Sequence, residues 1–170
     1  DKLRPRGVMA LVTSKGTMDK ENSAVRKYIA QRADLLGAIR LPNNTFKGNA
    51  GTEVVSDILI LQKRDRLMDI EPDWVHLDTD ENGIKMNSYF VQHPEMVLGE
   101  VQMVSGRFGE EMTVAPYKGA DLAEQLDEAI ANINGTIAEV ELDDELEDED
   151  NSIPADPTVR NFSYTCLLYT

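Results

Sequence analysis

The stretch LLGAIRLPNNTFKGNAGTEVVSDILILQKR, from Leu35 to Arg64, holds two apolar runs that are separated by a polar, glycine-bearing loop. No amphipathic helix can be written through the loop at residues 42–55, and a parallel return between strands usually needs one. The run after the loop, VVSDILILQ at residues 54–62, is therefore predicted to be a strand antiparallel to the run before it.

Upstream of this stretch lies another short apolar run, GVMALVT at residues 7–13, which suits a strand covered on both faces. A helix is predicted next, capped by Asp19 or Ser23. Its apolar spacing rests on Val25, Tyr28, Ile29, Arg32 and Leu36. Strand, helix and strand in this order predict a βαβ unit with a right-handed crossover. The predicted fold class is therefore α/β, with a mostly parallel sheet that ends in one antiparallel strand.

Downstream of Arg64 the pattern changes to that of a small α+β extension. Asn82-Gly83 lies between two part-alternating stretches and favours a hairpin. A second pair of short strands is expected around SGRFGE at residues 105–110, followed by a helix within residues 119–135. Asp121 and Glu124 form a capping-box pattern for this helix, and its apolar face would consist of Leu122, Leu126, Ile130 and Ile133.

Composition divides the chain into parts of opposite charge. Residues 1–64 carry 12 Lys and Arg against 6 Asp and Glu, and residues 65–170 carry 5 against 25, which gives +6 and −20. The predicted domains are a strand-rich part at 1–64, the extension at 65–138, and an acidic linker and tail at 139–170. A basic first part is compatible with a polyanion partner despite the formal net charge of −14.

The lone cysteine, Cys166, forms no disulfide within the chain and fits a reducing cytoplasm. No apolar run approaches the roughly 20 residues that a membrane helix needs, so no membrane partner is expected. The chain opens with Asp1 and is expected to be a piece of something longer.

Motifs of common catalytic sites are absent from the sequence. It contains no GxxxxGK[ST], GxGxxG or GxSxG pattern. His76 and His93 have no second metal-ligand pair nearby and are expected to be ordinary surface or packing residues. The sequence therefore indicates no catalytic residue and no metal site.

The loops after the first two strands carry the best binding candidates. In an open α/β sheet, ligands bind beyond the carboxyl ends of the parallel strands, so both loops are expected to share one rim. In the functional reading, Phe46 stacks on a nucleic-acid base while Lys15 and Lys47, with Ser14, contact phosphates. In the alternative reading, Phe46 folds back as a lid on the core.

These residues also support a resemblance to a known family. GVMALVTSKGTMDK and AVRKYIAQRADLLGAIRLPNNTFKGNAGTEVVSDILILQKR, within residues 3–64, resemble the last third of the methyltransferase domain of adenine-N6 DNA methylases, as in type I restriction-modification subunits. EPDWVHL, NSYFVQHPEMVLG and IPADPTVRNFSYT look like the large methylase-helicase polypeptides of bacterial phages and mobile elements.

The resemblance implies methyl transfer from S-adenosylmethionine to an adenine in DNA, on a Rossmann-like sheet ending in an antiparallel strand. Phe46 would help to hold the extruded adenine. The family's Asn/Asp-Pro-Pro-Phe/Tyr motif and glycine-rich cofactor loop are absent here, so the fragment alone is expected to be inactive and not to bind S-adenosylmethionine. DNA, the upstream half of the methyltransferase domain and a helicase module would be its partners. Thr13-Ser14 and Arg6 depart from the family pattern.

Two alternatives stay open at this point. The chain is a non-catalytic DNA-contacting or subunit-docking module, which would bind duplex DNA with a steep salt dependence. Alternatively, residues 65–138 are an interaction domain, and the acidic run at 139–150 keeps the basic part from binding nucleic acid promiscuously.

Overall fold

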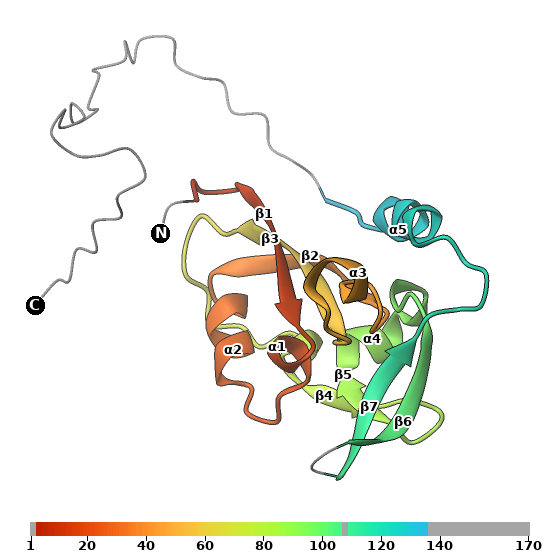
Figure 1. Cartoon of the computed structure of the whole chain (residues 1–170). Coiled ribbons are helices and arrows are strands. Elements are labelled where there is room, and N and C mark those ends of the chain that lie inside the picture. The colour runs from red at the N-terminus through yellow and green to blue at the C-terminus, as the bar shows by residue number, and fades with distance from the viewer. Residues whose placement is uncertain (1–2, 107–108, 136–170) are drawn as a thin grey trace, which may run out of the picture. The chain divides into compact units, whose positions relative to one another are not determined.

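A computed structural model describes residues 3–106 and 109–135 of the chain (Figure 1). Residues 1–138 belong to one compact unit. The predicted acidic linker and tail at 139–170 lie outside the described residues.

The described unit consists of short strands and short helices. In chain order these are β1 (Val8–Ser14), α1 (Gly16–Asp19), α2 (Ala24–Ala30), β2 (Ala33–Leu41), α3 (Lys47–Ala50), β3 (Ser56–Lys63), the 3-10 helix η1 (Asp73–Val75), β4 (Leu77–Thr79), β5 (Lys85–Asn87), α4 (Ser88–Gln92), the 3-10 helix η2 (Pro94–Met96), β6 (Glu100–Gly106), β7 (Gly109–Ala115) and α5 (Leu122–Ala131).

The largest sheet has three strands in the order β1-β3-β2, and β3 is antiparallel to both of its neighbours. The predicted reversal of the third strand is confirmed. The predicted Rossmann-like, mostly parallel sheet is wrong, because every strand pair in the described part of the chain is antiparallel. β1 and β2 do share a direction, but β3 lies between them. The prediction failed because a short apolar run suits a strand of an antiparallel sheet as well as a buried strand of a parallel sheet.

Helix α2 buries a different face from the one that the apolar spacing predicted. Val25 and Tyr28 are 59% and 58% exposed, whereas Arg26 is 1% exposed. The Arg26 guanidinium is held by main-chain carbonyls: Nε donates to Val75 (2.7 Å) and Nη1 donates to Lys20 (2.8 Å). The helix therefore packs through a hydrogen-bonded arginine together with Ile29 and Ala30, and leaves Val25 and Tyr28 on the surface.

The two hairpins and the helix predicted for the second half of the unit are confirmed. The predicted apolar face of that helix is only partly correct, because Ile130 is 54% exposed and Ile133 lies beyond the end of α5. β4 and β5 form an antiparallel hairpin whose turn contains Gly83 at φ 81°, a backbone conformation that favours glycine. β6 and β7 form the second hairpin. At the start of α5 the Asp121 side chain accepts a hydrogen bond from the Ala123 N–H (2.7 Å), as an N-cap residue does.

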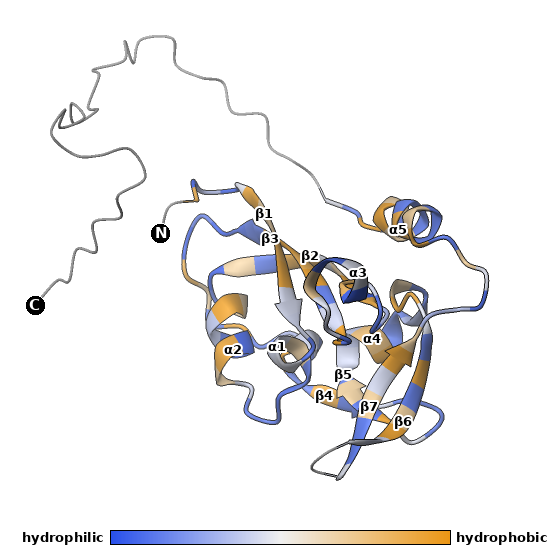
Figure 2. Cartoon of the chain, viewed as in Figure 1, coloured by the Kyte–Doolittle hydropathy of each residue, from blue (hydrophilic) through white to orange (hydrophobic). Residues whose placement is uncertain are grey.

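One hydrophobic core unites residues from both sides of position 64. Its buried members are Met18, Ala38, Ile39, Leu41, Val55, Leu59, Leu61, Met86, Phe90, Met96, Val97, Leu98, Met112, Val114 and Ala129. The two outer strands of the main sheet differ sharply in their burial. The last five residues of β2 are buried, whereas most of β1 is exposed, although β1 carries no charged residue (Figure 2).

Candidate functional site

The four residues predicted to contact DNA lie at one end of the three-stranded sheet, here called the closed end. β1 ends at Ser14 and β2 ends at Leu41, and both residues pair with Ser56 at the start of β3. The Lys15 N–H donates to the Val55 carbonyl (3.1 Å). The loops that follow β1 and β2 therefore begin side by side.

At the closed end, the candidate cations and the candidate aromatic ring all have partners within the protein. Lys15 Nζ donates to the main-chain carbonyl of Met112. Lys47 lies on the surface and forms an ion pair with Glu53. Phe46 is half-buried and packs against the core, which is the lid arrangement. A role for these residues in DNA binding stays a prediction.

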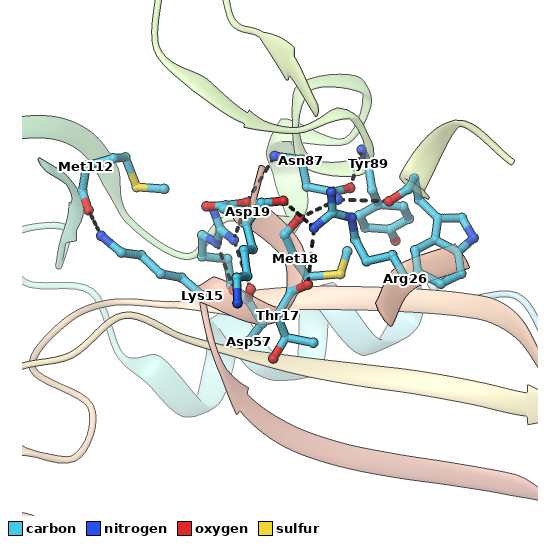
Figure 3. A network of polar contacts seen from close by, with 12 residues as sticks. Lys15, Thr17, Met18, Asp19, Arg26, Asp57, Asn87, Tyr89 and Met112 are labelled. Carbon is cyan, nitrogen blue, oxygen red and sulfur yellow. Dashed lines mark hydrogen bonds and ion pairs between the residues drawn. The ribbon is translucent and has the colours of Figure 1, made fainter. Parts of the chain in front are cut away.

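A buried network of ion pairs lies beneath this end (Figure 3). The Arg40 side chain is 0% exposed and donates to two carboxylates. Its Nε and Nη2 each lie 2.8 Å from Asp57, and its Nη1 and Nη2 lie 2.8 and 3.0 Å from Asp19. The Arg40 Cζ also lies 4.2 Å from the centroid of the Phe90 ring. The guanidinium is thus enclosed by two anions and an aromatic face.

The charges in this network stabilise one another. Burial disfavours the charged form of Arg40, but the hydrogen bonds and charges of Asp57 and Asp19 outweigh this, so the pKa of Arg40 is raised. All four carboxylate oxygens accept hydrogen bonds from the guanidinium. Such fully engaged carboxylates are poor general bases, and the arrangement suits a structural role.

Asn87 connects the network to the hairpin half of the unit. Its N–H donates to Asp19 (3.0 Å), and its Nδ2 donates to the carbonyls of Met18 (2.9 Å) and Trp74 (2.8 Å). The Asn87 side chain is also the N-cap of α4. One buried amide therefore fixes α1, η1 and α4 relative to one another.

Sequence reasoning missed this network, although a signal for it was present. Arg40 interrupts the apolar run LLGAIRL, and Asp57 interrupts the run VVSDILILQ. The two residues are direct cross-strand partners in the register of β2 and β3. Opposite charges inside two runs that are both expected to be buried indicate a buried pair.

The opposite end of the sheet, where β1 and β2 begin and β3 ends, is here called the basic end. Two adjoining grooves at this end share residues 63–66. Their lining contains two carboxylates, Asp34 and Asp65, of which Asp34 pairs with Arg64 (2.5 Å) and Asp65 pairs with Arg6 (3.9 Å). The cations that line the two grooves are Arg6, Arg32, Lys63, Arg64 and Arg66. Five cations against two carboxylates leave a net charge of +3.

The larger of these grooves, about 700 Å³ in volume, has an apolar floor. Met9 and Leu11 of β1 are 37% and 38% exposed there, and Leu67 is 66% exposed. Tyr28 of α2 lies against the same groove, and the Arg32 guanidinium covers its ring with Cζ 3.6 Å from the ring centroid. The basic end thus combines positive charge with exposed apolar surface.

Arg6, at the basic end, has an unusual backbone conformation. Its φ of 60° lies in the left-handed region, and among the described residues it is the one non-glycine residue with positive φ. This conformation costs a residue with a Cβ roughly 1–2 kcal/mol. The neighbouring turn is tight, because a Cβ on Gly7 would lie 2.9 Å from the Arg4 carbonyl oxygen.

Both histidines lie on the surface. His76 Nε2 is 3.2 Å from Glu71, and His93 Nδ1 is 3.3 Å from Glu95. Within residues 3–106 and 109–135, no three His, Cys, Asp or Glu side chains gather in a way that would hold a metal ion. No helix in the same residues is long and apolar enough to cross a membrane.

The chain is similar to the Defense against restriction protein B of Escherichia phage P1, with 32% identity over 83 residues. The similarity covers 48% of this chain and 4% of the phage protein. No protein-family model matches the chain, and no solved structure matches it.

These findings correct the resemblance to adenine-N6 DNA methyltransferases and to methylase-helicase polypeptides. The relative bears the name of a restriction-defence protein, and no family model of a methylase or a helicase matches. The antiparallel sheet also lacks the parallel order that the resemblance implied. The short strand–loop–strand motifs behind the resemblance specify two apolar runs and a turn, which unrelated folds share.

Proposed function

We propose that this chain is a non-catalytic DNA-contacting module whose basic end binds the phosphate backbone. The observation that carries the proposal is the charge of that end, where five cations line grooves with two carboxylates. Within the described part of the chain, Arg66 has neither a hydrogen bond nor an ion pair, so its guanidinium is available to a phosphate.

The conformation of Arg6 supports this assignment. A residue held in the left-handed region costs stability, and such strain is concentrated at functional sites. Glycine would adopt the same φ without the steric cost. An arginine at this position gives up stability but adds a cation to the basic end, and clustered positive charge attracts anions.

The relative gives independent support. A protein named for defence against restriction acts in a process in which DNA is the molecule attacked, and a DNA contact fits that setting. This chain spans about 4% of the relative's length, so the proposal concerns the described unit only. We assign no role to S-adenosylmethionine, because the resemblance that implied it is corrected. We propose the cytoplasm as the location, since the lone cysteine suits a reducing compartment.

The proposal is tested by fluorescence anisotropy of a labelled duplex with the full chain and its Arg66→Glu variant at about 50 mM salt. Each phosphate contact adds about 0.9 to the slope of log K against log salt, so loss of one contact lowers affinity roughly tenfold under these conditions. The Arg66→Glu variant should show this loss, and its salt slope should fall by about 1.

Lys47→Glu is the matched control, because Lys47 is an exposed cation at the closed end whose replacement changes the net charge equally. The duplex affinity of Lys47→Glu should stay within about twofold of that of the parent chain, because salt screens the effect of a charge far from the bound DNA. Equal losses in both variants would show a general charge effect and contradict a specific basic end. Absence of any duplex or single-strand binding at about 50 mM salt would reject DNA contact altogether.

A further inference from the structure

The apolar floor of the larger groove at the basic end is not explained by phosphate binding alone. Met9, Leu11, Tyr28 and Leu67 expose between 37% and 66% of their surface there. A duplex presents phosphates and sugars on its outside and keeps its base faces stacked within, so it would leave this floor in water. An exposed apolar patch with a charged rim indicates a ligand that carries both apolar faces and charge.

We infer that the groove binds single-stranded DNA, an inference that rests on the proposed function. An unpaired strand presents flat base faces together with phosphates, and single-strand sites combine aromatic side chains with a cationic groove. Four cations line this groove against one carboxylate, Asp65. The cations are Arg32, Lys63, Arg64 and Arg66. Charge complementarity therefore favours a polyanion over an acidic or neutral face of a protein as the occupant.

Tyr28 and Arg32 provide the stacking element. The Arg32 Cζ lies 3.6 Å from the Tyr28 ring centroid, and Arg32 Nη1 donates to the Tyr28 carbonyl (3.1 Å). The pair is therefore held as a flat, cationic unit before any ligand arrives, so little conformational entropy is lost on binding. Tyr28 is 58% exposed, which leaves ring surface for a base.

The exposed ring of Tyr28 is not needed for the core. Among the buried and half-buried residues of the hydrophobic core, α2 contributes Ile29, whereas Tyr28 is absent. An exposed tyrosine without a core contact is a surface anchor rather than a packing residue. Its replacement should therefore change binding and leave the fold intact.

The test compares an oligothymidine of about 15 nucleotides with a duplex of the same length, using anisotropy and the full chain. The single strand should bind at least about tenfold more tightly than the duplex. Tyr28→Ala should lower single-strand affinity about tenfold and leave duplex affinity within about twofold, and Tyr28→Phe should keep the tight binding, because it keeps the ring.

Tyr117→Ala is the control, since Tyr117 is 50% exposed but does not line this groove, and it should change neither affinity. Equal affinity for both DNA forms, with sensitivity to Arg66→Glu kept, would overturn the inference and leave the proposed function standing. Loss of single-strand binding in both tyrosine-to-alanine variants would also overturn it. A dimer that buries Tyr28 and excludes DNA, detected by light scattering, would reject the groove as a DNA site.

Discussion

The two ends of the three-stranded sheet use the same kinds of charged residue in opposite ways. At the closed end, Lys15, Arg40 and Lys47 each have a partner within the protein. The charge of these three cations is balanced by three carboxylates, Asp19, Asp57 and Glu53. At the basic end, five cations meet two carboxylates. The closed end suits a structural role, and the basic end is where we propose a ligand to bind. A cation in a loop therefore indicates a binding site only when its local partners are too few.

The largest expected effect breaks the closed end. Arg40→Met removes the one cation between Asp57 and Asp19 and leaves two carboxylates uncompensated, one of them fully buried. The free energy of unfolding should fall by about 3–5 kcal/mol, measured by urea denaturation. Adding Asp57→Asn to this variant should restore part of the loss, because it removes the buried charge. A loss below about 1 kcal/mol would show that the network contributes little.

A smaller loss of stability is expected for Lys15→Met. The substitution keeps the apolar stem but removes the hydrogen bond to the Met112 carbonyl, so the free energy of unfolding should fall by about 1–2 kcal/mol. Duplex affinity should remain within about twofold, because Lys15 already has a partner. A roughly tenfold loss of DNA affinity without loss of stability would place DNA at the closed end instead.

Arg6→Gly tests the basic end, because it should raise the free energy of unfolding and lower the affinity for DNA. Glycine relieves the strain of φ 60° but increases the entropy of the unfolded chain, so a net gain of about 0.5–1 kcal/mol is expected. Duplex affinity should fall, since one cation is lost. Arg6→Ala is the companion variant, which loses the charge and keeps the strain. A gain in both stability and affinity for Arg6→Gly would contradict the role given to this residue.

The smallest expected effect concerns pH. Because the pKa of Arg40 is raised above its usual value, its contribution to stability is fully present below the pKa of the unfolded state and is lost only as pH rises past the still higher pKa of the folded state. The change in unfolding free energy between neutral and mildly alkaline pH should therefore be the same in the parent chain and in the Arg66→Ala variant. A steep fall of stability between these conditions, absent from Arg40→Met, would contradict a permanently charged Arg40.

Much of the fold was predictable because local rules decide it. The loop at residues 42–55 is too polar and too rich in glycine and asparagine for an amphipathic crossover helix, which favours a reversed β3. The Asn82-Gly83 hairpin and the Asp121 cap follow from turn and cap chemistry. The order of strands was not predictable in this way, because an apolar run shows that a strand is buried but does not identify its neighbour.

The candidate site shows the same limit. That Lys15 and the loop containing Phe46 would lie together followed from the common direction of β1 and β2. The partner of Lys15 comes from far along the chain, since Met112 is 97 residues away, and no local pattern indicates such a contact. The charge of +6 in residues 1–64 predicted a basic region, but its position became clear only once Arg6 and Arg64 were brought to one end of the sheet.

β1 has one further consequence, which concerns handling of the protein. Among the described strands it pairs only with β3, and the register is unbroken over all seven residues, none of them charged and none proline. Outer strands of natural proteins usually carry a lysine, a proline or a bulge that discourages stray hydrogen bonding between molecules. Concentrated samples are therefore expected to aggregate by pairing through this edge strand. Val12 is 61% exposed, and Val12→Lys should reduce this aggregation.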